Sequence, residues 1–322
     1  MTGASTQSPN LPAAFSWLET NPFFQAGLQG YSDAAMRIIS RRHGSPYCVT
    51  EAMPDQFLVN GGKGLKAAEL DPEDHPIAGQ LMGSDPLNMA KAARVLIELG
   101  YDVIDLNMAC PVKRLRKNIR GGHLLNRPED AIAIIREIRQ AVGSSVPLTI
   151  KLRRGFDDEQ ASEKAFIQIL EEAIEQEYFA VTVHGRTVRQ KYEGPSRWSF
   201  LAELTRRYPH FRIMGSGDIF SPESIFDMIS ETGVAAVSVA RGSIGNPWIF
   251  RQARLLLETG WEVLEGAGLT AASVEGSSTG VYVGICGSEY GSRAMTDLSE
   301  INAYTGLGAA HSAQVGRLSY TF

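Results

Sequence analysis

One stretch of the chain decides the fold, Val103-Ile104-Asp105-Leu106-Asn107-Met108-Ala109-Cys110-Pro111. Its first four residues form a short, largely apolar run that is typical of a buried strand. An asparagine and a lone cysteine follow closely. Polar side chains at the exit of a buried strand lie where parallel α/β folds keep their active sites. Cys110 taken alone is more often a structural thiol, because free cysteine is among the most buried residue types.

The same pattern recurs along the chain, because short apolar runs alternate with helix-length amphipathic segments. The predicted strands are 23–28, 47–51, 77–81, 103–106, 148–152, 180–183, 212–216 and 236–240. The predicted helices are 32–43, 55–68, 86–99, 128–142, 161–176, 198–208 and 222–232. Eight strand–helix units in about 240 residues predict an α/β fold, a (β/α)8 TIM barrel, with a doubly wound open sheet as the alternative. The dinucleotide-binding pattern Gly-x-Gly-x-x-Gly does not follow the first strand, which disfavours that alternative.

Length and composition indicate a globular protein with three parts. Of its 322 residues, 43% are hydrophobic and 21% are charged, which is ordinary for a soluble protein. Residues 1–12 are small and polar, and residues 1–20 are expected to be a disordered leader. Residues 21–258 are expected to form the barrel, and residues 259–322 a separate, poorly ordered extension. No apolar run is long enough to span a membrane, and there is no secretory signal. Three scattered cysteines disfavour disulfides and metal. We therefore expect a cytoplasmic protein with neither a membrane nor a metal partner, and the oligomeric state stays open.

A basic cluster follows the cysteine, although the net charge of the chain is −5. The cluster consists of Lys113, Arg114, Arg116, Lys117 and Arg120. Basic side chains concentrated in one loop favour a polyanionic substrate.

Polar residues lie at the C-terminal end of nearly every predicted strand, and in a barrel these ends converge on one rim. They are Gln29, Ser32, Glu51, Gln80, Asn107, Cys110, Lys151, Arg153, His184, Arg186, Ser216, Asp218 and Arg241. Glycine-rich loops after the last two strands, 215–218 and 240–243, favour a phosphate-bearing cofactor over ordinary turns. Lys151 lies inside a buried strand, where an ammonium is costly unless it faces an anion such as the N1–O2 edge of a reduced flavin. Gln80 is a candidate for the pyrimidine edge of that flavin, and His184 is a candidate donor to the flavin or to a substrate carbonyl.

Six motifs, in order and at consistent spacing, carry a family resemblance. They are 105–111 (Asp-Leu-Asn-Met-Ala-Cys-Pro), 120–125 (Arg-Gly-Gly-His-Leu-Leu), 151–153 (Lys-Leu-Arg), 183–187 (Val-His-Gly-Arg-Thr), 216–219 (Ser-Gly-Asp-Ile) and 241–248 (Arg-Gly-Ser-Ile-Gly-Asn-Pro-Trp). Residues from about 22 to 258 resemble the FMN-dependent tRNA-dihydrouridine synthases. The resemblance implies an FMN barrel, reduced by NADPH, that transfers hydride to carbon 6 of a uracil in tRNA.

The resemblance also implies roles for individual residues. Cys110 would protonate carbon 5, Asn107 would hold the uracil amide edge with Arg153 nearby, and the basic cluster would bind tRNA phosphates. The implied FMN contacts are Gly27, Leu28, Gln29, Gln80, Lys151, His184, Ser216, Gly217, Asp218, Ala240 and Arg241. Three motifs depart from the family: Ala26-Gly27-Leu28 stands where Ala-Pro-Met is usual, Ser216 replaces an asparagine, and Ala109 replaces the glycine before Cys-Pro.

The end of the chain has a different likeness. From about residue 254 the sequence resembles the N-terminal part of a polyketide ketosynthase domain, without that family's catalytic residues. This ketosynthase-like segment stands where members of the dihydrouridine synthase family usually have a basic helical domain that binds tRNA. Two alternatives therefore stay open: an FMN barrel that reduces a free pyrimidine or enone, and an inactive remnant.

Overall fold

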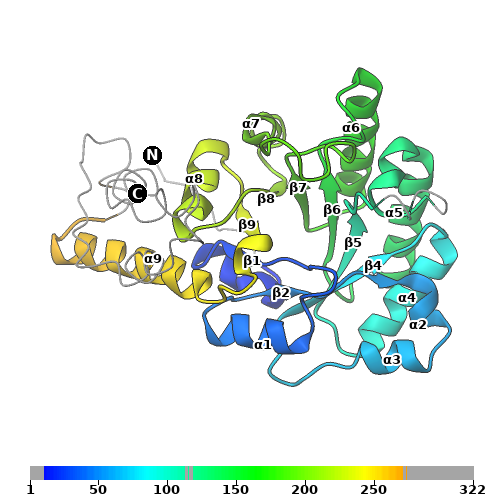
Figure 1. Ribbon diagram of the computed structural model, residues 1–322, viewed down its shortest axis with the longest axis horizontal. Coiled ribbons are helices and arrows are strands. Elements are labelled where there is room, and N and C mark those ends of the chain that lie inside the picture. Colours follow the sequence, from blue (N-terminus) through cyan, green and yellow to red (C-terminus); the bar gives the residue numbers. More distant parts are fainter. Residues whose placement is uncertain (1–10, 113–114, 116–118, 271–272, 274–322) are drawn as a thin grey trace, which may run out of the picture.

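The computed structural model describes residues 11–112, 115, 119–270 and 273. Its strands are β1 (Phe23–Gln25), β2 (Cys48–Val49), β3 (Met53–Pro54), β4 (Ile77–Met82), β5 (Val103–Met108), β6 (Leu148–Arg153), β7 (Ala180–His184), β8 (Arg212–Ser216) and β9 (Ala236–Val239). All recorded pairings between them are parallel, and short β3 pairs only with β4. Because β9 pairs with β1, and β2 pairs with both β1 and β4, the sheet closes on itself (Figure 1). The predicted TIM barrel is confirmed, and the open-sheet alternative is wrong.

The helices surround the sheet and begin close to the predicted positions. They are α1 (Ala34–Arg42), α2 (Asp55–Val59), α3 (Lys63–Ala67), α4 (Pro86–Glu98), α5 (Pro128–Val142), α6 (Gln160–Glu175), α7 (Trp198–Arg207), α8 (Pro222–Thr232) and α9 (Ile249–Gly266). Asp85 caps α4 by accepting from the backbone N–H of Asn88 at 2.7 Å, and proline occupies the first turn. The single helix predicted over 55–68 is wrong. It is two helices, because Gly61 and Gly62 have φ of 74° and 62°, outside the helical region.

A short 3₁₀ helix, η1 (Ala13–Glu19), closes the end of the barrel where the strands begin. The ring of Phe15 is fully buried and stacks on Phe179, which immediately precedes β7, with centroids 3.9 Å apart. Trp17 is buried beside it and stacks on Tyr47. The disordered leader expected over residues 1–20 is therefore wrong for 13–19, because two aromatic side chains there bury apolar area in the barrel floor.

The last described helix, α9, runs straight through the predicted boundary at residues 258 and 259. Figure 1 shows it extending away from the barrel. Its first turn is buried at Ile249 and Phe250, whereas Trp261 and Val263 beyond the barrel are 49% and 64% exposed. The boundary expected at 258/259 is thus not a break in structure. The extension from 274 onward lies outside the described residues, and within them no helix combines the length and apolarity that crossing a membrane requires.

Candidate functional site

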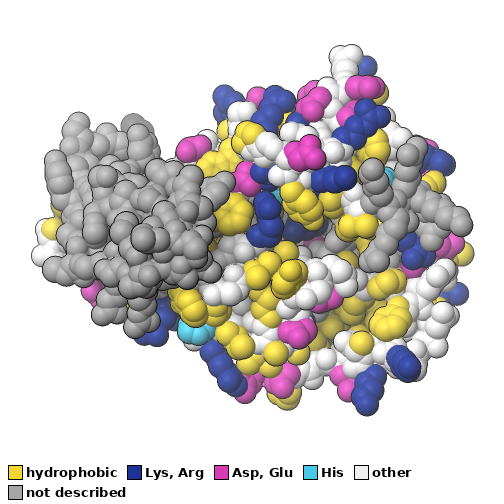
Figure 2. Space-filling model, in the orientation of Figure 1, with side chains coloured by type: hydrophobic (Ala, Val, Ile, Leu, Met, Phe, Trp, Pro, Cys, Tyr) yellow, Lys and Arg dark blue, Asp and Glu magenta, His cyan; other side chains and the backbone are white. Residues whose placement is uncertain are grey.

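The ends of the strands bring together most of the residues predicted for the site. Gly27, Gln80 and Lys151 line a cavity inside the barrel. A second pocket is lined by His184, Ser216, Gly217, Asp218, Ile219, Phe220, Ser238, Ala240 and Arg241. Ser238 on β9 lines both, so the two spaces are neighbours. Figure 2 shows Lys and Arg side chains gathered in a hollow, with hydrophobic side chains around it.

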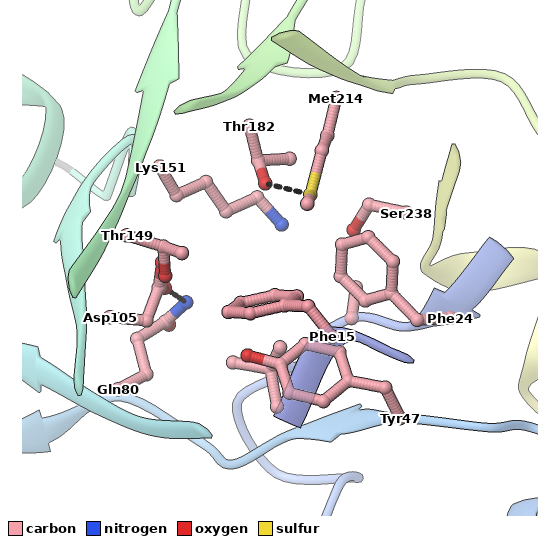
Figure 3. A pocket seen from close by; sticks show the side chains of 13 residues that line it. Phe15, Phe24, Tyr47, Gln80, Asp105, Thr149, Lys151, Thr182, Met214 and Ser238 are labelled. Atoms are coloured by element: carbon pink, nitrogen blue, oxygen red, sulfur yellow. Dashed lines mark hydrogen bonds between the residues drawn. The ribbon is translucent and has the colours of Figure 1, made fainter. Parts of the chain in front are cut away.

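Lys151 extends from β6 into the inner cavity (Figure 3). Burial lowers the pKa of its ammonium, and the carboxylate of Asp105 partly opposes this shift. No carboxylate forms an ion pair with it among the residues that the structure describes. An ammonium in this position would be stabilised by an anion placed in the cavity.

His184, at the end of β7, is held as a neutral donor. Its Nδ1 accepts from the backbone N–H of Arg186 at 3.1 Å, which places the ring proton on Nε2. Burial lowers the pKa of His184 to about 2, and four cations reinforce the shift. These cations are Arg153, Lys151, Arg186 and Arg241. The barrel mouth is therefore a strongly positive region that a phosphate or a flavin anion would neutralise.

The second pocket is lined by a loop with left-handed backbone angles. Gly217 and Asp218 have φ of 117° and 63°, and successive N–H groups in such loops favour anions. The carboxylate of Asp218 accepts from the backbone N–H of Ser196 at 2.7 Å and from Arg186 at 2.8 Å, which fixes the loop. A Cβ at Gly242 would lie 2.3 Å from the Ile219 carbonyl oxygen, so the adjoining turn η4 (Arg241–Ser243) packs tightly against it. These features, with the buried cations, fit a phosphate-bearing flavin.

Arg241 projects at the rim of this pocket between two exposed aromatic rings. Its guanidinium carbon lies 5.2 Å from the ring centroids of both Tyr192 and Phe220. One guanidinium nitrogen is 3.6 Å from an Asp218 oxygen. These contacts hold the side chain beside the pocket.

Cys110 is a half-buried free thiol on the loop after β5. Asn107 holds that loop, because its Oδ1 accepts from the backbone N–H groups of Ala109 and Cys110, both at 3.1 Å. The backbone N–H of Gly122 donates to the Cys110 carbonyl at 2.9 Å. Asn107 Nδ2 also donates to Gln80 Oε1 at 2.7 Å. Asn107 therefore has an N–H left for a ligand, while its oxygen already serves two donors.

Arg153 also supports this loop. Its Nε donates to the Ala109 carbonyl at 2.8 Å, and its Nη1 donates to the carbonyls of Thr187 and Lys191 at 2.8 and 2.7 Å. Burial lowers its pKa to about 10. The residue predicted to lie near the substrate thus joins the Cys110 loop to the loop after β7, as well as adding charge to the mouth.

Close contacts hold the residues that follow the first strand, Gly27 to Gln29, in position. A Cβ at Gly27 would lie 2.1 Å from the Thr50 carbonyl oxygen, so no larger side chain fits this backbone. The backbone N–H of Leu28 donates to the Ser32 hydroxyl oxygen at 2.7 Å. Gln29 Nε2 donates to Glu51 at 2.8 Å. Gly27 lines the cavity, whereas Leu28 and Gln29 are not among its lining residues.

The basic cluster is placed only in part. Lys113, Arg114, Arg116 and Lys117 lie outside the described residues. Arg120 was expected to be an exposed residue that binds phosphate, because it belongs to the basic cluster, but the structure places it differently. Its side chain is only 15% exposed and lies 3.5 Å from Asp55, whose pKa is raised by burial. Arg120 joins the end of this loop to α2.

Sequence reasoning missed several residues that the structure places in the site. Asp105 accepts hydrogen bonds from Gln80 and from Thr149 on the next strand, and Ser238 faces both pockets. A carboxylate inside an otherwise apolar run is a signal that could have singled out Asp105, since buried charges require partners. Tyr192 carries no comparable signal in the sequence.

Comparisons with known proteins show which families this chain resembles. The family model described as Dihydrouridine synthase (Dus) matches residues 24–263, and a model for the N-terminal domain of beta-ketoacyl synthase matches residues 249–322. A tRNA-dihydrouridine synthase B from Pseudomonas aeruginosa is 35% identical over 74% of this chain and 71% of its own length. A probable tRNA-dihydrouridine synthase 1 from Synechocystis is 33% identical over 73% of this chain, which spans only 65% of that relative. A histamine dehydrogenase from Rhizobium shares the fold, with a TM-score of 0.55, 17% identity and coverage of 73% of this chain and 46% of its own.

Proposed function

The chain belongs to the dihydrouridine synthase family, and on that premise we propose that it reduces uridine in tRNA to 5,6-dihydrouridine, with FMN as cofactor and NADPH as reductant. The observation that carries the proposal is the Lys151 ammonium, which forms no ion pair among the described residues and faces a cavity beside a glycine-lined pocket. In this proposal, the flavin ring lies toward Lys151 and its phosphate tail toward the glycine-lined pocket. When bound, FMN supplies the hydride that carbon 6 of the uracil receives.

The residues divide the work of holding this cofactor. Lys151 would neutralise negative charge on the flavin ring, and Gln80 and His184 Nε2–H would hydrogen-bond its polar edge. The backbone of 217–218 and 240–241, with the Arg241 side chain, would hold the phosphate. Gly27 would let the ring approach the first strand end.

Cys110 would donate the proton that carbon 5 of the uracil needs. The thiol loses a proton in this step and becomes a thiolate. Asn107 would donate its remaining N–H to a uracil carbonyl, and the base would leave its stack to reach the site.

The proposal is tested by purifying the protein, recording flavin absorbance and measuring dihydrouridine in unmodified tRNA with and without NADPH. We expect a yellow protein whose product depends on NADPH. A colourless protein that makes no dihydrouridine after FMN is added would favour an inactive remnant.

Cys110→Ala should keep the flavin and lower turnover by about 100-fold or more, because the proton donor is lost. Cys48→Ala is the matched control, since Cys48 is a buried thiol on β2. Normal turnover by Cys110→Ala would disprove the proton-donor role.

A reductase of free pyrimidines or enones is the second candidate, since the family match covers the barrel alone. Salt separates the two functions. Binding of tRNA through phosphates weakens steeply as salt rises, whereas binding of a neutral ring does not. Turnover of free uracil that exceeds turnover of tRNA, with little salt dependence, would favour the second candidate.

A further inference from the structure

A continuous set of hydrogen bonds joins three neighbouring strands to the loop that carries Cys110. Thr149 Oγ1 on β6 donates to Asp105 Oδ1 on β5 at 2.6 Å, and Gln80 Nε2 on β4 donates to Asp105 Oδ2 at 2.7 Å. Asn107 Nδ2 donates to Gln80 Oε1 at 2.7 Å. The set ends where Asn107 Oδ1 accepts from two backbone N–H groups of the loop, one of them that of Cys110.

The two ends of this set fix the direction of every bond in it. A carboxylate only accepts hydrogen bonds, and a backbone N–H only donates. Between these ends, each amide has a single orientation that satisfies both neighbours: Gln80 turns its NH₂ toward Asp105, and Asn107 turns its NH₂ toward Gln80. Rotating either amide would set oxygen against oxygen or N–H against N–H.

Burial makes the set expensive to break. Gln80 and Asp105 are 1% and 4% exposed, so water does not readily replace a lost partner. A buried polar group left without a partner costs about 1–3 kcal/mol. A disturbance at Asp105 therefore reaches, through Gln80, the amide that holds the backbone of Cys110.

We propose that Asp105 is a positioning residue: by accepting from Gln80, it holds the Gln80–Asn107 pair in the orientation that fixes the backbone of Cys110. Asp105 acts through these two amides and not on the substrate. The holding of the loop is independent of the proposed function. Only the purpose of the fixed thiol, proton donation to uracil, rests on it.

An exchange of the two interacting groups tests this role. Gln80→Glu sets two carboxylates against each other where an amide and a carboxylate now meet, so Glu at 80 is displaced and Asn107 loses its support. Adding Asp105→Asn restores the set, because Asn at 105 can accept from Thr149 and donate to Glu at 80, which still accepts from Asn107. The exchange also keeps the total charge of the pair.

The readout is the rate at which iodoacetamide alkylates Cys110 in flavin-free protein at pH 8, with peptide mass spectrometry to distinguish it from the other cysteines. We expect Gln80→Glu to raise this rate about tenfold, because losing one buried hydrogen bond frees the loop. The double variant Gln80→Glu/Asp105→Asn should return to within about twofold of the unaltered protein. Thermal unfolding of each variant monitors the global fold.

Gln29→Glu is the matched control. Gln29 also donates from its amide to a carboxylate, Glu51, but this pair has no hydrogen bond to the Cys110 loop. The control should leave Cys110 alkylation unchanged. An unchanged rate in Gln80→Glu, or a double variant as reactive as Gln80→Glu, would overturn the proposal. Because alkylation needs neither flavin nor tRNA, a protein that makes no dihydrouridine would refute the proposed function and leave this test intact.

Discussion

Lys151 combines a cost to folding with a benefit to ligand binding. Its ammonium is buried on β6 without an ion pair among the described residues, and burial lowers its pKa. The cost to the folded protein is fully present at pH values below that lowered pKa. This cost disappears as the pH rises toward the ordinary lysine pKa of about 10.4, because Lys151 is then neutral in the unfolded chain as well as in the folded protein.

Lys151→Met should therefore stabilise the flavin-free protein at pH 7 and weaken FMN binding by about 10- to 100-fold, since a charged hydrogen-bonding partner is lost. Thermal unfolding and flavin titration measure the two effects. Lys164→Met, at an exposed position of α6, is the matched control and should change neither. Unchanged FMN affinity in Lys151→Met would remove Lys151 from the cofactor site.

His184 predicts how stability depends on pH. Its pKa of about 2 in the folded protein means that acid protonates it in the unfolded chain first. Stability is therefore lost as the pH falls below the unfolded value of about 6.5, by up to about 1.4 kcal/mol per pH unit.

The difference in unfolding free energy between pH 7 and pH 5, measured with urea on flavin-free protein, should shrink by about 2 kcal/mol in His184→Gln. His210→Gln, which changes an exposed histidine before β8, serves as the matched control. An identical pH dependence in His184→Gln and the unaltered protein would contradict a neutral His184.

At the scale of elements, the proposed phosphate site lies where two turns pack backbone against backbone. Gly242 allows η4 to lie against the loop after β8, with a hypothetical Cβ only 2.3 Å from Ile219 O and 3.0 Å from Phe220 Cα. Backbone atoms cannot give way as a flexible side chain does, so a methyl group there forces the two turns apart.

Gly242→Ala should lower both the flavin content of the purified protein and its stability, the latter by about 1–3 kcal/mol. Absorbance and thermal unfolding measure these losses. Gly266→Ala is the control, because a Cβ at Gly266 meets nothing within 4 Å. Full flavin content in Gly242→Ala would show that the proposed phosphate site tolerates a wider gap.

At the scale of the whole molecule, η1 covers the end of the barrel where the strands begin, and the candidate site lies toward the opposite end. Phe15 from η1 fills the space where the strands begin and contacts rings from two distant segments, Phe179 and Tyr47. Phe15→Ala should cost about 3–5 kcal/mol of unfolding free energy in urea, because it leaves a cavity in the core. Trp261→Ala, on the exposed part of α9, should cost far less. Equal losses in the two variants would mean that η1 contributes little to the closed barrel.

Local sequence patterns predicted the elements well, and tertiary packing explains where they failed. Helices with both a start signal and an apolar stripe, such as Pro128–Val142 and Pro222–Thr232, lie where their residues predict. The segment 55–68 carries a similar stripe, yet two adjacent glycines divide it. The helix η1 was not predicted, because it follows a polar segment. Its two aromatic side chains are buried only when the closed barrel provides the surface on which they pack.

The candidate site follows the same division. The sequence by itself determined that a thiol, a lysine and a histidine lie at or just after the C-terminal ends of buried strands, because the length and composition of each apolar run show where the strand ends. Only the tertiary structure decided what each one touches. Gln80 and Thr149 meet Asp105 across 25 and 44 residues of chain, and Arg153 reaches the Ala109 carbonyl across 44. Side-chain hydrogen bonds of this kind depend on strand order and register in the closed barrel, which no local pattern of residues encodes.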